Sequence, residues 1–509
     1  MKKYVIMMMT AGLFLASCKK TSQPAEESES PERFTSQQID GFIREKLRDN
    51  GRFEWSMAGT DMIWSALQQS DQVLSVGYKP EAVPESAIRL HEVDIRSKAW
   101  SDARAQVMQI ILEEERLTRK DITEKDLVQW DEQYLPVIDV RIENYATLKR
   151  LLSSKLIRYA EPMGYEPSVP ADKVSSSSGC DGNGPESLVE NADYSSIAPG
   201  CKQSWNHPYH KISSAWTKSS GAGVKVFVID TGCEFDQDNL GTAFNQGYSS
   251  GRTIEKIVTL PRSTFLGIPT GPVETADDGC GHGTAMAGAL AAPRGIDGAA
   301  CGIAYNCNLV TCRAAADVFL DESREVKGAS DAFTNAANRS DVRIISMSMG
   351  KITSSSQLKD AIVYAYGKNK LIFCAAGTSF SWTSGWYGVI FPAYLAQVNA
   401  VTGVRDNSFT TTCTTCHDGS ETDFTVVIEK ASNERHPITL AASGNVPSTV
   451  GGSSVSTAQT AGMAALVWSR FPTYTRDQVL NKLVSSGSNY PTRNSNLGWG
   501  NIDADKATN

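Results

Sequence analysis

The chain has 509 residues, 41% of them hydrophobic and 21% charged, which is enough for two or three globular domains. Its net charge of −8 gives no indication of a nucleic-acid-binding protein, so we expect no nucleic-acid partner. Eleven cysteines are many for a protein of a reducing compartment, and this number favours export.

The first residues have the features of an export signal. Lys2 and Lys3 precede an apolar run, residues 4–15, that is too short to remain as a membrane-spanning helix. The run ends in Leu-Ala-Ser-Cys, which resembles a bacterial lipobox. The resemblance implies a signal peptide over residues 1–18 and a lipidated Cys18 that anchors an exported protein to the lipid bilayer, on the periplasmic face or the cell surface. An ordinary signal peptide with a chance cysteine, or an uncleaved anchor, is the alternative.

Residues 19–70 are predicted to form a tether and two helices. The tether is rich in Ser, Pro and Glu, as solvated linkers are. Thr35 and Ser36 can cap a first helix with apolar residues at helical spacing, and Gly51 would end it. A second short helix follows over 62–67.

Residues 71–170 are predicted to form a small α/β sandwich. Its expected strands lie at 73–78, 137–142 and 156–159, and its helices at 103–117 and 145–154. The one histidine of this region, His91, has no recognisable partner, so we expect it to be a surface or packing residue. A Ser/Gly/Pro-rich joint follows over 167–184 and is an expected site of proteolysis.

From about residue 206, strands alternate with helices, which favours a mostly parallel sheet flanked by helices. A buried strand over 223–230 ends at Asp230, and catalytic groups gather at such carboxyl ends. His282 lies between two glycines and precedes a helix of small residues. The structural alternatives are that Asp230 caps a turn and that His282 is a buried core histidine.

Ser453 and Ser454 begin another helix of small residues, where free backbone N–H groups could stabilise an oxyanion. Two further strands, 344–350 and 371–377, end in small residues. An extended peptide could form hydrogen bonds between these two strand ends.

Five motifs resemble those of the subtilisin family of serine proteases, in that family's order: Asp-Thr-Gly at 230–232, Gly-His-Gly-Thr at 281–284, Ser-Met-Gly at 348–350, Ala-Ala-Gly at 375–377 and Gly-Ser-Ser at 452–454. The resemblance covers about residues 205–503. It implies an exported endopeptidase that cleaves peptides through an acyl-enzyme. Ser454 would be the nucleophile, His282 the general base and acid, and Asp230 the group that orients His282. Substrate would bind along Ser348, Met349, Gly350, Ala375, Ala376 and Gly377.

The same resemblance extends to residues 71–170, which have the layout of the family's propeptides. Such a propeptide is a folding aid, an inhibitor and a partner of its own protease until self-cleavage removes it. The strand and turn at 156–162 would enter the active site. Residues 171–509 would then be the catalytic domain, whereas the helices of 36–70 do not belong to the family pattern.

The chain departs from the family at the oxyanion site. Thr378 occupies the position of an asparagine whose amide donates to the oxyanion. Thr378 could donate directly or through water, another side chain could replace it beside the Ser454 N–H, or the enzyme could be slow. The alternatives to an active endopeptidase are therefore a weak peptide-binding protein or a processing protease of narrow specificity.

The family places the aspartate and histidine blocks side by side, which implies a Cys233–Cys280 disulfide. Proximity in sequence suggests the pairs Cys301–Cys307, Cys180–Cys201 and Cys413–Cys416. We expect Cys312 and Cys374 to be buried free thiols, because the family fold separates their strands.

Cys-Thr-Thr-Cys-His at 413–417 matches the c-type haem attachment pattern. Its polar neighbours favour a small disulfide loop over haem or metal binding. No cofactor is expected to be required. Calcium is a possible structural ion, because Asp236, Asp238 and Asn239 lie where many relatives bind it, but they form no clean ligand set and we assign no metal.

Overall fold

A computed structural model describes residues 30–167, 180, 183–265, 268–378 and 388–509. Cys18 and the signal segment lie outside these residues, as does most of the joint. Within the described part of the chain, no helix has the length and apolar character needed to cross a bilayer.

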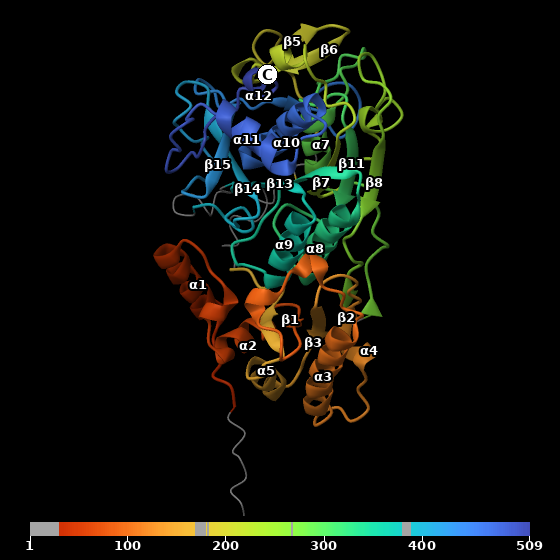
Figure 1. Cartoon of the computed structure of the whole chain (residues 1–509), viewed down its shortest axis with the longest axis vertical. Coiled ribbons are helices and arrows are strands. Elements are labelled where there is room, and N and C mark those ends of the chain that lie inside the picture. Colours follow the sequence, from red (N-terminus) through yellow and green to blue (C-terminus); the bar gives the residue numbers. More distant parts are fainter. Residues whose placement is uncertain (1–29, 168–179, 181–182, 266–267, 379–387) are drawn as a thin grey trace, which may run out of the picture.

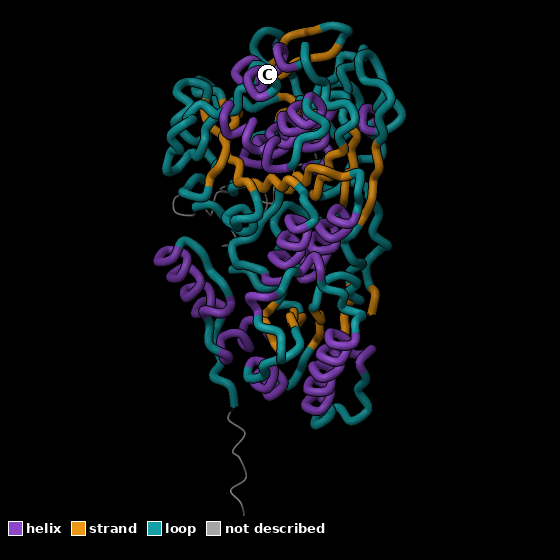
Figure 2. Tube along the Cα trace, viewed as in Figure 1, coloured by secondary structure: helices purple, strands orange, loops and turns teal. Residues whose placement is uncertain are grey.

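The chain folds into alternating layers of helices and sheets (Figures 1 and 2). The larger sheet has seven parallel strands in the order β15-β14-β13-β12-β7-β11-β8. Helices α7 (His282–Ala291) and α10 (Gly452–Arg470) cover one face, and α8 (Ser323–Asn338) and α9 (Ser356–Gly367) cover the other. The predicted parallel sheet flanked by helices is confirmed. Its strands are β7 Lys225–Asp230, β8 Ile254–Val258, β11 Asn308–Arg313, β12 Val342–Met347, β13 Leu371–Ala375, β14 Asn399–Arg405 and β15 Thr422–Glu429.

The central strands are rich in apolar residues because both faces of the sheet are buried. Small residues bring the covering helices close to their neighbours. A Cβ on Gly288 of α7 would lie 2.9 Å from the Leu440 nitrogen, and one on Gly462 of α10 would lie 2.8 Å from Ile303. Glycine is needed at both positions for this close packing.

The register of the parallel strands brings the candidate motifs to one edge of the sheet. Met347 of β12 pairs with Ile229 of β7 on one side and with Cys374 of β13 on the other. Asp230, Ser348 and Ala375, the residues that follow these three, therefore share the carboxyl edge.

Residues 30–167 form a smaller unit with an antiparallel sheet in the order β2-β3-β1-β4. The predicted strands and helices of this unit are confirmed with small shifts at their ends. They are β1 Val73–Tyr78, β3 Val137–Arg141, β4 Ile157–Pro162, α2 Thr60–Gln68, α3 Lys98–Glu115 and α5 Tyr145–Leu152. Strand β2 Val128–Trp130 and helix α4 Glu124–Leu127 were not predicted. Helix α1 (Ser36–Asn50) is capped by Thr35 and ends at Gly51, which has a φ of 71°.

The antiparallel sheet packs against α8 and α9 (Figure 1). Asp71 accepts hydrogen bonds from the backbone N–H (3.1 Å) and hydroxyl (2.7 Å) of Ser323 at the start of α8. Glu161 accepts the corresponding pair from Ser356 at the start of α9. Each carboxylate therefore lies at the positive end of a helix of the larger unit. His91 packs against Gly367 at the end of α9, which confirms it as a packing residue.

The remaining elements are short or peripheral. They are β5 Tyr194–Ile197, β6 Cys201–Ser204, β9 Thr264–Phe265, β10 Ile268–Pro269, β16 Ile438–Thr439, β17 Ser448–Thr449, α6 Ile212–Ala215, α11 Arg476–Ser486 and α12 Ala504–Ala507. Single-turn 3₁₀ helices lie at Trp55–Met57, Glu85–Ala87, Leu90–Glu92, His207–His210 and Asp238–Leu240.

Candidate active site

Three elements carry the candidate catalytic residues. Asp230 is the last residue of β7, His282 is the first residue of α7, and Ser454 lies in the first turn of α10. Helices α7 and α10 pack against each other on the same face of the sheet. A helix that starts with a functional residue presents it beside the positive end of its dipole.

Asp230 and His282 are brought together. The Asp230 Oδ1 atom lies 2.7 Å from His282 Nδ1, and Asp230 also accepts a hydrogen bond from the Thr231 backbone N–H at 2.9 Å. Asp230 is fully buried and His282 is 8% exposed. A carboxylate in this position fixes the imidazole orientation and leaves Nε2 as the other ring nitrogen for proton transfer.

Asp278 organises the chain around this pair and was missed by the sequence analysis. Its Oδ1 accepts hydrogen bonds from the Thr231 hydroxyl (2.8 Å) and the Gly281 N–H (2.8 Å). Its Oδ2 accepts two from Thr284, the N–H at 2.8 Å and the hydroxyl at 2.7 Å. The fully buried carboxylate thus joins the end of β7 to the first turn of α7. An aspartate four residues before His282 was the available sequence signal.

Ser454 faces the end of β12. Its hydroxyl donates to the Ser348 carbonyl oxygen at 3.4 Å, while the Ser348 hydroxyl donates to the Ser454 carbonyl oxygen at 3.0 Å. These contacts fix the first turn of α10 against the carboxyl edge of the sheet. They place Ser454 at the rim of a cavity.

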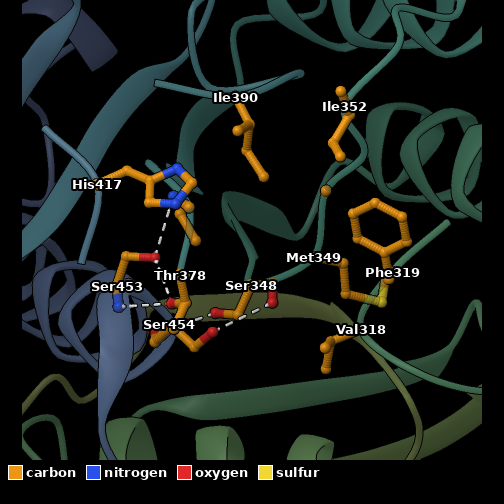
Figure 3. Close-up of a pocket in the computed structure, with 13 residues that line it drawn as sticks. Val318, Phe319, Ser348, Met349, Ile352, Thr378, Ile390, His417, Ser453 and Ser454 are labelled. Carbon is orange, nitrogen blue, oxygen red and sulfur yellow. Dashed lines mark hydrogen bonds between the residues drawn. The ribbon is translucent and has the colours of Figure 1, made fainter. Parts of the chain in front are cut away.

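The cavity is small, with a volume of about 40 Å³ (Figure 3). Apolar side chains form one side and hydroxyl groups the other, so it suits an apolar side chain whose backbone lies near the hydroxyls. Its lining residues are Val318, Phe319, Ser348, Met349, Gly350, Ile352, Ala375, Gly377, Thr378, Ile390, His417, Ser453 and Ser454. Of the expected substrate-binding residues, Ala376 alone is missing from this set; its backbone is bonded to Val401 and Ile390 instead.

Gly350 does not offer the free backbone groups that the predicted hydrogen bonding of a peptide to this strand end would need. The Gly350 N–H donates to the Val318 carbonyl at 3.2 Å, and the Leu320 N–H donates to the Gly350 carbonyl at 3.0 Å. Both backbone groups of Gly350 are therefore already paired. The sequence pattern could not reveal this, because the partner segment lies thirty residues away and has no strand pattern of its own.

Thr378 contacts Ser453 at the amino end of α10. The Thr378 hydroxyl accepts a hydrogen bond from the Ser453 N–H at 3.2 Å, and the two hydroxyl oxygens are 3.1 Å apart. Gly452, with a φ of 77°, permits this approach: a Cβ there would lie 2.7 Å from Thr378 Oγ1. The expected oxyanion position is thus next to the candidate nucleophile.

His417 also lines the cavity, a role that the sequence analysis missed. Its backbone N–H donates to the Gly377 carbonyl at 2.9 Å, and the preceding Cys416 forms a β-bridge with Thr378. Burial lowers the pKa of His417 to about 4, so the imidazole is neutral at pH 7. The motif that resembled a haem site is therefore part of the cavity wall (Figure 3).

Cys413 and Cys416 are joined in a disulfide, as predicted, so their sulfurs are not available for attachment of haem. The other three predicted pairs are wrong. Cys280 is joined to Cys180, whereas Cys201, Cys233, Cys301 and Cys307 are buried free thiols. Cys312 and Cys374 are also buried free thiols, as expected.

The Cys180–Cys280 disulfide has a structural cause. Residues after Cys180 lie along the segment that precedes α10: Asn183 donates to the Leu440 carbonyl at 2.9 Å, and Glu186 accepts from the Thr449 N–H at 2.8 Å. This path brings Cys180 to the histidine loop rather than to Cys201.

In the loop of Asp236, Asp238 and Asn239, the Asn239 amide is engaged in protein contacts. The Asn239 side chain is bonded at both ends, to Asn445 (3.0 Å) and Gln246 (2.6 Å). Among the described residues, no group of three His, Cys, Asp or Glu side chains has metal-binding geometry.

Comparison with known proteins agrees with this architecture. The model of the Subtilase family matches residues 221–500. Subtilisin DY of Bacillus licheniformis is 28% identical over 272 residues, which are 53% of this chain and 85% of that protein. The subtilisin of Bacillus sp. strain TA39 is 25% identical over 317 residues, 59% of this chain and 68% of that protein.

Among solved structures, that of the MycP3 protease from the type VII (ESX-3) secretion system aligns with 64% of this chain and 91% of its own, with 22% identity and a TM-score of 0.47. The family model alone covers more than half of the chain, including β7, α7 and the first turn of α10. The chain therefore belongs to the subtilase family.

Proposed function

We propose that the protein is a serine endopeptidase that hydrolyses peptide bonds through an acyl-enzyme on Ser454. The observation that carries the proposal is the 2.7 Å contact between Asp230 and His282 in a member of the subtilase family. Peptides or proteins are the substrates that this family membership implies. In this proposal the reaction uses side chains and backbone N–H groups of the chain and a water molecule.

In the proposed mechanism, His282 Nε2 removes the proton from the Ser454 hydroxyl as its oxygen attacks the substrate carbonyl carbon. Asp230 accepts a hydrogen bond from the His282 Nδ1–H and stabilises the imidazolium that forms. His282 then gives its proton to the leaving amine, and the acyl-enzyme remains. Water, deprotonated by His282, hydrolyses the ester and regenerates Ser454.

The tetrahedral intermediate carries a negative charge on the former carbonyl oxygen. The Ser454 N–H lies in the first turn of α10, where backbone donors and the helix dipole both favour an anion. This N–H supplies one oxyanion donor. Thr378, next to the same turn, is the proposed source of the second.

We propose that residues 71–170 are a propeptide and 171–509 the catalytic domain. The contacts of Asp71 and Glu161 with the starts of α8 and α9 support this assignment, because they join the two parts of the zymogen. Glu166 continues the contact by accepting the backbone N–H of Ile352 at 3.0 Å, beside the cavity. Cleavage in the joint at 167–184 would release the propeptide. The lipobox sequence supports export and anchoring through Cys18.

Labelling with a serine-directed fluorophosphonate tests the proposal. The wild-type chain should be labelled and should lose its propeptide, whereas Ser454→Ala should remain unlabelled and full-length. Absence of both labelling and processing in the wild type would instead identify a peptide-binding protein. For localisation, Cys18→Ser should move the protein from the membrane fraction to the soluble exported fraction.

A further inference from the structure

The hydroxyl groups of Ser453 and Thr378 form a closed hydrogen-bonding unit beside the candidate nucleophile (Figure 3). The Gly377 N–H donates to Ser453 Oγ at 3.1 Å, and the Ser453 N–H donates to Thr378 Oγ1 at 3.2 Å. The two hydroxyl oxygens are 3.1 Å apart. Ser453 is fully buried, whereas Thr378 is partly exposed at the cavity.

The positions of the two hydroxyl protons follow from counting donors and acceptors. One proton lies between the two oxygens, and the other is left to bond elsewhere. If Ser453 donates to Thr378, the Thr378 oxygen accepts twice, and its own proton is directed away from Ser453. If Thr378 instead donates to Ser453, the proton left without a partner is that of the Ser453 hydroxyl, which has no contact with solvent. The first arrangement is favoured, because a buried donor without an acceptor costs about 1–3 kcal/mol.

We propose that Ser453 is a positioning residue that makes Thr378 the second oxyanion donor. This inference rests on the proposed function, because it concerns the oxyanion formed during attack by Ser454. Ser453 occupies both lone pairs of the Thr378 oxygen through its N–H and its hydroxyl. The Thr378 proton is then free to donate to the substrate oxygen, a role that the sequence pattern of the family gives to an asparagine amide.

Two features strengthen Thr378 as a donor. Its hydroxyl lies at the amino end of α10, so the positive end of the helix dipole polarises it. The chain of donors from the Gly377 N–H through Ser453 to Thr378 also polarises each successive O–H bond. A threonine hydroxyl is shorter than an asparagine amide, and the absence of a side chain at Gly452 lets it approach the helix.

The test is a double-mutant cycle on the self-processed enzyme, with kcat and KM measured on a chromogenic peptide. Thr378→Val keeps the shape but removes the donor, and should lower kcat by about 10²- to 10³-fold with KM little changed. Thr378→Ser keeps the hydroxyl and should restore most of the activity. Ser453→Ala should lower kcat about tenfold in the wild type, because the Thr378 proton loses its preferred direction.

The decisive result is the coupling between the two positions. Ser453→Ala should have no further effect in the Thr378→Val enzyme, and little effect in a Thr378→Asn enzyme, whose amide brings its own donors. Ser456→Ala removes another fully buried hydroxyl of α10 and is the matched control, with kcat expected to be unchanged.

Three outcomes would overturn the inference. The first is full kcat in Thr378→Val. The second is an equal loss from Ser453→Ala in both backgrounds, which would mean a merely structural role. The third is a wild type that neither cleaves peptide nor reacts with fluorophosphonate; the proposed function would then fail, and the inference with it. In the first two outcomes the wild type is active, so the proposed function stands.

Discussion

Arg158 of β4 and Asp360 of α9 form a buried, bidentate ion pair across the contact between the two parts of the chain. The guanidinium Nη1 lies 2.5 Å from Asp360 Oδ2, and Nη2 lies 3.0 Å from Oδ1. Both side chains are only 7% exposed. The pair therefore ties the smaller unit to the helix layer of the larger one in a fixed orientation.

Loss of Arg158 should weaken this contact strongly. Arg158→Ala leaves the Asp360 carboxylate buried without its cation, which typically costs about 3–5 kcal/mol. Chemical denaturation of the full-length Ser454→Ala chain measures the change. Arg150→Ala, which removes solvent-exposed ion pairs with Glu113 and Glu114, is the control and should change the stability little. Equal effects of the two substitutions would contradict the assigned importance of the Arg158–Asp360 pair.

The contact should also depend on pH. Burial raises the pKa of Asp139 to about 7, although the nearby Lys327 partly offsets this rise. Burial likewise raises the pKa of Glu161 to about 7, although hydrogen bonds from Ser356 partly offset it. In the separated, solvent-exposed state both groups return to ordinary values near 4. Their contribution to stability is therefore full below about pH 4 and is lost as the pH rises through about 7.

Thermal unfolding of the Ser454→Ala chain between pH 5 and pH 9 checks this dependence. The midpoint should fall as the pH rises, and Asp139→Asn should flatten that slope because the group no longer titrates. A midpoint that rises with pH, or a slope unchanged by Asp139→Asn, would contradict the prediction.

Asp278 should be required for the geometry of the Asp230–His282 pair. Asp278→Asn replaces an accepting oxygen by a donor that faces the N–H groups of Gly281 or Thr284. We expect kcat/KM to fall about tenfold or more, since disruption of a buried network costs about 1–3 kcal/mol. Asp277→Asn, at the adjacent and partly exposed aspartate, is the control. Similar activity of the two variants would remove Asp278 from this role.

The Cys180–Cys280 disulfide should stabilise the larger unit. It closes a segment with a sequence separation of 100, and loss of such a bond typically costs about 2–5 kcal/mol. Peptide mapping without reduction should recover the linked Cys180 and Cys280 peptides, and Cys180→Ser should lower the thermal midpoint. Recovery of a Cys233–Cys280 peptide instead would restore the family-based pairing.

The Cys413–Cys416 loop should carry no haem. Because each sulfur is bonded to the other, neither is available for a thioether link. The purified protein should show no Soret absorbance, with and without dithionite. A haem band that disappears in Cys413→Ser would contradict the structure at this loop.

The sequence predicted the features that depend on local patterns. Apolar runs predicted the strand that ends at Asp230 and the strand at 344–350, although the second strand ends at Met347 in the structure. Small residues predicted helices α7 and α10, because close packing leaves a clear pattern. The order of the motifs then placed Asp230 and His282 together. These predictions needed only neighbouring residues or a resemblance of several motifs.

The errors all concern contacts between segments that have no pattern of their own. Cys180 reaches Cys280 because Asn183 and Glu186 bind to distant loops, which no spacing of cysteines encodes. His417 reaches the cavity because the loop that carries it pairs with Gly377, a contact that no local pattern encodes. Pairing of Gly350 with residue 318 is likewise a property of the folded chain alone.

The link between Cys180 and Cys280 has a consequence for the proposed maturation. If the joint were cut before Cys180, the new amino-terminal segment would remain covalently linked through Cys180 to Cys280, which lies two residues before His282. After the proposed cleavage the upstream piece could leave, whereas Cys180 would stay bonded to Cys280. Reducing conditions would break this covalent link and leave the segment held by hydrogen bonds such as those of Asn183 and Glu186.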